Sequence, residues 1–272
     1  MSAGFTIAEL TELDDLRALA ELFRLVWGIH GEPPIDSDVL KALSLSGNYI
    51  SGGYAGTRMV GGLVGWLGGV PPHELHLHSH ILGVLPGSDA HGLGFELKLH
   101  QRRWCLERGL GVIEWTTDPL VRRNAYFNLT KLGARARGYL VNFYGEMKDG
   151  LNAGEESDRL LISWRLDSPS AEEAATGRNV EPRLDASVIT GAARILSVGP
   201  DGGPVATPAH SSARVLLCQV PEDIVELRRR DPALARSWRM ALRQCLTEEF
   251  ARGYEVSGAT RSGWYVLEAA AE

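Results

Sequence analysis

A glycine-containing turn between an apolar run and a long helical stretch is the feature that most constrains this chain. The run ends at Val84-Leu85-Pro86, the turn covers residues 89–94, and residues 95–108 have a helical pattern. This order predicts a strand, a loop and a helix, in which glycines let backbone N–H groups approach an anion that the helix dipole favours. The same helix carries further cationic side chains, namely Lys98, His100, Arg102 and Arg103.

Two other phosphate-binding loops fit this pattern less well. A dinucleotide-binding loop needs a strand near the start of its domain and an acidic residue at the end of the next strand. Here several predicted strands precede the loop, and no Gly-Lys-Ser/Thr follows it, which excludes a Walker loop. The formal net charge of −6 argues against nucleic-acid binding, so we expect a local anion site only.

The elements around this loop resemble the core of the GNAT N-acyltransferase superfamily over residues 5–166. They include a strand over Val112–Thr117 and a second helix that ends at Lys131-Leu132-Gly133-Ala134. The resemblance implies that the loop binds the pyrophosphate of acyl-coenzyme A and that the preceding strand binds its pantetheine arm. The cofactor-binding residues expected from it are Leu82, Val84, His91, Gly92, Leu93, Gly94, Phe95 and Asn124.

The loop departs from the family's Arg/Gln-x-x-Gly-x-Gly/Ala pattern at its first position, where Asp89 stands. An acidic residue beside a pyrophosphate is unexpected. Asp89 therefore either caps the helix and points away from the cofactor or lowers the affinity for it.

Three histidines alternate along the expected strand, His76, His78 and His80. Alternation places their side chains on one face of the sheet. The His-x-His-x-Leu-x-Val arrangement of residues 78–84 is similar to a strand of arylalkylamine N-acetyltransferases, which implies that His80 and His78 relay the proton of the amine. The side chain suits this task because its free pKa lies near neutrality. Structural histidines at a sheet edge and a metal site are the alternatives.

Two further residues are expected to bind the substrate, Asp118 and Arg159. Asp118 or Glu114 could position an amine, although Asp118 could instead cap the turn before Pro119. Arg159 could hold a carboxylate in bidentate fashion, or form a surface ion pair with Asp158.

The acid that protonates the leaving thiolate is missing from its usual place. Within the helix Arg122–Leu132, Leu129 replaces the tyrosine that serves this role in the family. We expect Tyr144 to supply the acid, with Tyr126 as the alternative; aromatic residues at such spacings also belong commonly to a core.

The predicted fold class is α/β, a GNAT-like mixed central sheet flanked by helices. Residues 1–166 form the acyl-coenzyme-A-binding domain, 167–180 a linker, and 181–272 a smaller α+β segment that is either a degenerate GNAT-like half or an unrelated extension. The other expected elements are strands at 5–9, 48–54, 59–67, 139–147, 160–166, 214–221, 254–257 and 264–267, a helix after Thr11 or Asp14, a helix at 232–252 and a turn at 199–204.

The sequence thus predicts a coenzyme-A-dependent N-acyltransferase that moves an acetyl or other short acyl group to a small amine or amino acid. A catalytically degenerate coenzyme-A-binding or regulatory protein is the alternative, favoured by Asp89 and Leu129. No long apolar run or signal peptide is present, so we expect a cytoplasmic protein without membrane partners. An exposed sheet edge is compatible with a homodimer. Three cysteines, at no metal-like spacing, predict reduced thiols.

Overall fold

The computed structural model describes residues 4–69, 74–145, 156–178, 181–182, 192–208 and 213–269. These residues form two compact units, the first ending at Trp115 and the second beginning at Thr116.

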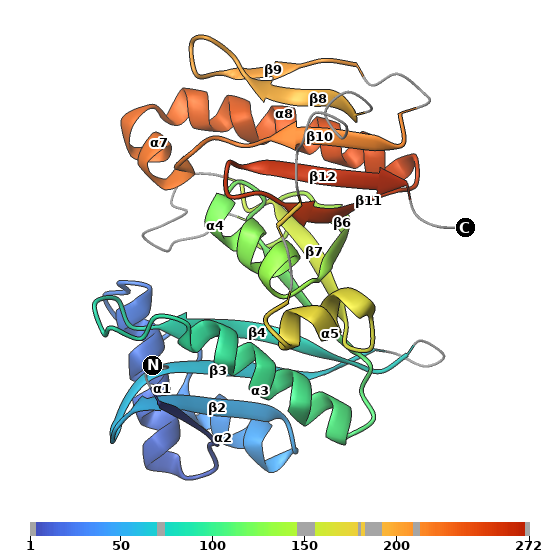
Figure 1. Ribbon diagram of the computed structural model, residues 1–272. Helices are drawn as coiled ribbons and strands as arrows, with labels where there is room; N and C mark the ends of the chain where they lie inside the picture. Colours follow the sequence, from blue (N-terminus) through green and yellow to red (C-terminus); the bar gives the residue numbers. More distant parts are fainter. Residues whose placement is uncertain are drawn as a thin grey trace. The chain divides into compact units, whose positions relative to one another are not determined.

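In the first unit the strands follow the order β1-β2-β3-β4-β5. Figure 1 shows β2, β3 and β4 of this sheet with α3 lying across them. Neighbouring strands from β1 to β4 are antiparallel, whereas β4 and β5 are parallel and are joined through a helix. Its elements are β1 Phe5–Glu9, α1 Leu13–Val26, α2 Ser37–Leu45, β2 Tyr49–Ala55, β3 Arg58–Gly68, β4 His76–Val84, α3 Leu93–Glu107 and β5 Val112–Thr117.

Glycines in the strands of this unit allow helices to lie close on both faces of the sheet. A Cβ atom at Gly62 would collide with Leu19 of α1, and one at Gly61 would lie 2.8 Å from Leu93 of α3. Helix α1 therefore covers one face and α3 the other. The α1 face forms a core with α2, composed chiefly of Leu16, Leu19, Phe23, Leu40, Ile50 and Val64.

The second unit has a sheet in the order β7-β6-β11-β12-β10-β8-β9. Its elements are α4 Arg122–Ala125, the π-helical turn η1 Tyr126–Lys131, β6 Arg135–Leu140, β7 Arg159–Arg165, α5 Pro169–Ala175, β8 Ala192–Val198, β9 Pro204–Ala206, β10 Val215–Gln219, α7 Ile224–Arg230, α8 Pro232–Ala251, β11 Tyr254–Ala259 and β12 Trp264–Ala269.

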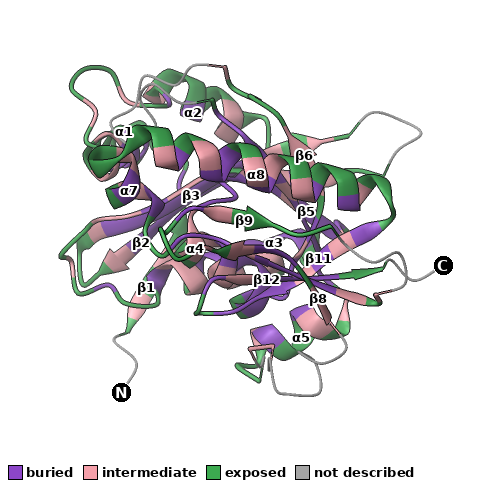
Figure 2. Ribbon diagram, turned by 90° about the horizontal axis from the view of Figure 1, so that it is seen from above, coloured by how far each residue is buried: buried purple, intermediate pink, exposed green. Residues whose placement is uncertain are grey.

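Helix α8 is the main helix of this unit and is amphipathic. Figure 2 shows buried positions alternating with exposed ones along it. The buried residues Ala235, Trp238, Leu242 and Leu246 recur every three or four positions, as expected for a helix that packs one face on a sheet. The helix begins after Asp231, whose carboxylate accepts the N–H of Leu234, with Pro232 at its first position.

The predicted class of a mixed α/β sheet flanked by helices is confirmed, and most of the expected strands are present. Two local predictions are wrong. Glu12, without a side-chain cap, precedes α1 in place of Thr11 or Asp14. Strand β6 ends at Leu140, so the strand predicted to continue to Met147 stops there, and residues 146–147 lie outside the described residues. Residues 167–180, the expected linker, include α5, capped by Ser168, and the linker itself remains a prediction.

The C-terminal strands and helix follow one another in the same order as β4, α3 and β5, but their strands pair differently. Strands β4 and β5 are direct parallel neighbours. In the second unit β12 lies between β10 and β11 and is antiparallel to both. The two halves therefore share an order of elements but differ in their strand pairing.

Candidate functional site

A β-bulge in β4 determines which side chains face each side of the first sheet. Gly65 of β3 pairs with Ser79, and the preceding Val64 pairs with Ile81, so His80 has no partner on β3. An extra residue in one strand reverses the alternation beyond it. Ser79 faces α3, where it accepts a hydrogen bond from Lys98. Leu82, three positions on, faces α3 as well, because a Cβ at Gly94 of α3 would lie 3.6 Å from it.

His78 and His80 share the opposite face, where both rings contact Trp66. The ring centroid of Trp66 lies 4.3 Å from that of His80 and 5.1 Å from that of His78. The two imidazole centroids are 5.7 Å apart. Trp66 itself packs against the core beneath α1 and α2. The two predicted relay residues are therefore neighbours on the α1 face of the sheet.

Both histidines are neutral at neutral pH. Burial lowers the pKa of His78 to about 4, and the nearby His80, His76 and Lys98 add to this effect. Desolvation by surrounding atoms also lowers the pKa of His80, although its side chain remains exposed at the surface. A neutral imidazole can accept a proton.

Glu114 lies beside these histidines. It pairs in register with His78 across the β4–β5 boundary. Its carboxylate is 3.7 Å from Nε2 of His76 and is partly exposed. The α1 face of the first unit thus combines neutral bases with one accessible carboxylate.

The glycine loop leads into α3 as predicted, but the helix begins two residues earlier, at Leu93. Gly92 is its N-cap residue, with φ of 93°, and no side chain caps the helix. Asp89 is exposed, with φ of 50°, and does not cap α3, so of the two alternatives the one in which it caps the helix is wrong. A Cβ at Gly92 would have no heavy atom within 4 Å, and His91 is exposed. The N-terminus of α3 is open to a ligand.

Two of the four side chains expected to form a cationic surface on α3 are not free at the surface. Lys98 is buried, with 3% of its surface exposed. His100 is half-buried and its Nδ1 lies 2.8 Å from the hydroxyl of Tyr49. Lys98 and His100 therefore belong to the packing of α3 on the sheet.

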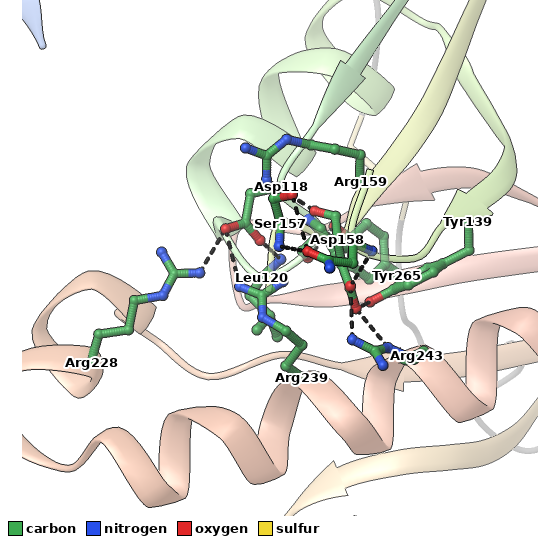
Figure 3. Close-up of polar contacts among 12 residues, drawn as sticks. Asp118, Leu120, Tyr139, Ser157, Asp158, Arg159, Arg228, Arg239, Arg243 and Tyr265 are labelled. Carbon is green, nitrogen blue, oxygen red and sulfur yellow. Dashed lines mark hydrogen bonds and ion pairs between the residues drawn. The ribbon is translucent and has the colours of Figure 1, made fainter. Parts of the chain in front are cut away.

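Asp118, expected to bind substrate, is engaged by two arginines in the second unit (Figure 3). Its Oδ2 is 2.6 Å from Arg228 of α7 and 3.4 Å from Arg239 of α8, and its Oδ1 accepts the N–H of Leu120. Burial alone would raise the pKa of Asp118, but Arg239, Arg228 and the Leu120 N–H outweigh it and lower that pKa. This carboxylate is buried and is already neutralised.

Asp158 and Arg159 are both buried, so the alternative of a surface ion pair between them is wrong. Asp158 accepts hydrogen bonds from the Tyr139 hydroxyl and from Arg243, at 2.7 and 2.8–2.9 Å (Figure 3). The Arg159 guanidinium donates to the carbonyl of Asp158 and lies 5.3 Å from the ring of Tyr144. These contacts hold the start of β7 against α8.

The tyrosines considered as acids lie in the second unit. The hydroxyl of Tyr144, a half-exposed residue, is 3.0 Å from that of Thr116. The Tyr126 hydroxyl accepts from Arg261. Leu129 is a core residue with 2% exposure, and Asn124 is half-buried on α4.

The predicted site residues thus fall in both units. Leu82, Val84 and residues 91–95 lie in the first with the histidines, and Asp118, Asn124, Tyr144 and Arg159 lie in the second. Sequence reasoning missed Trp66, because its contact with the histidines follows from the β3–β4 register. The periodic burial of Leu93, Leu97, Gln101 and Trp104 on α3 could have indicated that Lys98 is buried.

Among the described residues, no group of three or more His, Cys, Asp or Glu side chains could hold a metal ion. The three cysteines are free, as predicted. No helix in the described ranges combines the length and the apolar character that a membrane crossing needs.

No protein-family model matches this sequence, and neither does any curated protein. Among solved structures, the chain is similar to the ribosomal-protein-S18-alanine N-acetyltransferase from Escherichia coli, at 16% identity and a TM-score of 0.48, covering 61% of this chain and 96% of that one. It is also similar to yncA from Salmonella typhimurium, solved with acetyl-CoA, at 15% identity and a TM-score of 0.48, covering 67% and 99%.

A third similar structure is Naa50 from Arabidopsis thaliana, solved with a bisubstrate analogue of coenzyme A. Its identity is 16% and its TM-score 0.46, over 58% of this chain and 97% of that one. Identities this low say nothing about the substrate of this chain.

Proposed function

We propose that this chain is a GNAT-type N-acyltransferase that uses acyl-coenzyme A to acylate a small amine or amino acid. The observation that carries this proposal is the pair of sites on β4. Its end leads through the glycine loop to the open N-terminus of α3, and its middle presents His78 and His80 on the α1 face, beside Glu114 of β5. An anion site and a base on one strand are what transfer from a phosphate-bearing thioester to an amine requires.

The α3 N-terminus is suited to the pyrophosphate of coenzyme A. Backbone N–H groups of residues 91–95 would hold its oxygens, helped by the helix dipole. The positive φ of Gly92 supports this orientation, and the lack of a side-chain cap leaves the N–H groups accessible. Leu82 and Val84 of β4 would contact the pantetheine arm, and Asn124 remains a predicted contact.

His80 is the proposed base for the amine. It is exposed, and its lowered pKa keeps it neutral and able to accept a proton at neutral pH. The pKa of His78, near 4, makes a proton on that ring costly. His78 would therefore position His80 and complete the relay only transiently, while Glu114 would attract the ammonium form of the substrate.

A groove next to the histidines offers room for the acceptor. It measures roughly 530 Å³ and lies between α2 and the end of β3, within the volume range of small-molecule sites. Its polar residues are already bonded, Asn48 to Leu43 and Leu67, and Ser46 to the carbonyl of Ala42. The other lining residues, mainly Ile35, Val39, Leu43, Trp66 and Leu67, would contact an apolar part of the substrate.

A binding or regulatory protein that retains the cofactor site without turnover is the second candidate. The buried Leu129 favours it, because no hydroxyl is available at that position. Tyr144 remains the predicted acid, Asp118 and Arg159 remain predicted substrate contacts, and a cytoplasmic location and a homodimer also remain predictions.

A thiol-release assay separates the two functions. Purified protein is given acetyl- or succinyl-coenzyme A with and without a panel of amines and amino acids, and coenzyme A binding is measured in parallel by calorimetry. We expect release of free coenzyme A only when a suitable amine is present. Binding without amine-dependent release would support the regulatory alternative, and the absence of binding would refute both.

A further inference from the structure

Strands β4 and β5 separate after a short parallel contact. Leu77 pairs with Ile113 and His78 with Glu114, and no further pair joins the two strands in the described part of the chain. The next residue on β4 is Ser79, and the next residue on β5 is Trp115. The sheet of the first unit therefore has a fork at Ser79 and Trp115, on the strand that carries His80.

Lys98 of α3 occupies this fork on the face opposite the histidines. Its Nζ donates to Oγ of Ser79 at 2.7 Å and to Oε1 of Gln101 at 3.2 Å. It lies 3.8 Å from the centroid of the Trp115 ring. The side chain of Lys98 thus touches both strands at the point where they part.

The fork is rich in donors and lacks an anion. Within the described residues Lys98 forms no ion pair, and Nε2 of the fully buried Gln101 has no hydrogen-bond partner. A buried cation without a counter-charge is costly to maintain. An arrangement of this kind is suited to an electron-rich group that arrives from outside the chain.

We propose that the Lys98 ammonium stabilises and protonates the thiolate of coenzyme A when the thioester opens, an inference that rests on the proposed function. The reaction needs an acid that protonates this sulphur. In the family a tyrosine supplies this acid, and Leu129 stands at the position of that tyrosine here. As the amine nitrogen bonds to the carbonyl carbon, the C–S bond breaks with its electron pair on sulphur. Lys98 gives one proton to that sulphur, His80 takes one from the nitrogen, and both exchange with solvent.

The acidity of Lys98 supports this role. Burial lowers its pKa to about 7, with Cys105 of α3 opposing the shift. A thiol of ordinary pKa, about 8.5, is the weaker acid, so transfer from the ammonium to the thiolate is favourable. On β4, His78 also interacts with Lys98, and it stays neutral above pH about 4. The rate of acyl transfer should therefore fall as pH rises above about 7.

The test compares coenzyme A with desulfo-coenzyme A, which lacks the sulphur, in binding to wild type and Lys98→Met. Lys41→Met, an exposed lysine on α2, is the matched control. We expect wild type and the control to bind coenzyme A at least about tenfold more tightly than the desulfo form. Lys98→Met should bind both equally, with unchanged affinity for the desulfo form. The kcat of Lys98→Met should be about 10²-fold lower than that of wild type. Its rate should no longer fall at alkaline pH.

Lys98→Met could instead discriminate between the two compounds as strongly as wild type and keep the fall in rate at alkaline pH. That result would overturn this inference but not the proposed function. Wild type that binds neither compound would overturn the proposed function as well. If Lys98→Met does not fold, Ser79→Ala serves instead, because it removes the hydroxyl that holds the ammonium. Ser79→Ala should reduce the preference for coenzyme A over the desulfo form and shift the pH at which the rate falls. If both measurements match wild type, the inference is overturned.

Discussion

His78 and Lys98 show at the residue scale how burial sets the charge state of the candidate site. Both groups lose hydration, and the pKa of each falls, to about 4 for His78 and about 7 for Lys98. Desolvation disfavours the charged form of a base. The consequence is a site in which His78 is neutral at neutral pH and Lys98 is about half protonated.

The lowered pKa of Lys98 predicts how stability depends on pH. Between pH 7 and 10.5 the unfolded chain binds more protons at this lysine than the folded chain, so wild type should gain stability as pH rises through this range. The gain has an upper limit of about 1.4 kcal/mol per pH unit. Lys98→Met should lack this gain. Urea unfolding of both proteins from pH 6 to 10 measures it, and parallel curves would contradict the prediction.

His80→Gln is expected to lower kcat by about 10²–10⁴-fold with little change in acyl-coenzyme A affinity. The loss should shrink as pH rises, because free amine then becomes abundant without a base. His30→Gln, an exposed histidine outside the site, is the control. A pH–rate profile that matches wild type would mean that the strand histidines are structural, and Glu114 would become the candidate base.

The residues of the site were predictable to different degrees. Alternation sufficed to group His78 and His80, because a period of two is local. Asp118 was less predictable, since its partners Arg228 and Arg239 lie more than a hundred residues further along the chain. Lys98 was interpreted as a surface cation because lysine is rarely buried. Its actual environment depends on how α3 packs.

At the scale of elements, the strand patterns predicted β1 to β5 well, because apolar runs and glycine turns mark them. The bulge at His80 was not predictable, since an unpaired residue is defined only by the register with β3. The π-helical turn η1 was missed for a similar reason. It is supported by a tertiary contact, in which Thr130 donates to the carbonyl of Ala259.

Gly94 offers a test at the same scale, because it lies inside α3 with room for a side chain. An added Cβ would be 3.6 Å from Leu82 and 3.9 Å from Val84, which is ordinary contact. Gly94→Ala should therefore stabilise the fold, by up to about 1 kcal/mol from helix propensity. Gly94→Val should remain folded but lose coenzyme A binding, because its side chain would fill the space of the pyrophosphate. Calorimetry measures both, and unchanged affinity in folded Gly94→Val would refute the cofactor assignment.

At the scale of the whole molecule, the second unit joins distant parts of the chain. Ala136 of β6 pairs with Val256 of β11, and Asp158 is paired with Arg243 of α8. The expected boundary near residue 167 remains a prediction. Composition suggested it, since residues 167–177 are polar, but composition does not report which strands pair.

A chain shortened to residues 1–167 tests that boundary. It would leave the buried carboxylates Asp118 and Asp158 without their arginines and would remove β11, the partner of β6. We expect an insoluble or inactive product, because unpaired buried charges are strongly destabilising. A chain ending at residue 269 is the control. Solubility and circular dichroism decide, and a soluble, active 1–167 chain would show that the C-terminal segment is a separate appendage.

The pairing of Asp118 with Arg228, 110 residues later, has a consequence for biosynthesis. A ribosome that adds about 5–20 residues per second needs roughly 5 to 20 s to make the intervening chain. During that time the first part of the second unit is already synthesised but lacks the cations that neutralise it. We expect the nascent chain to depend on chaperones in this interval. The second unit should complete its folding only after the arginines of α7 and α8 have been synthesised.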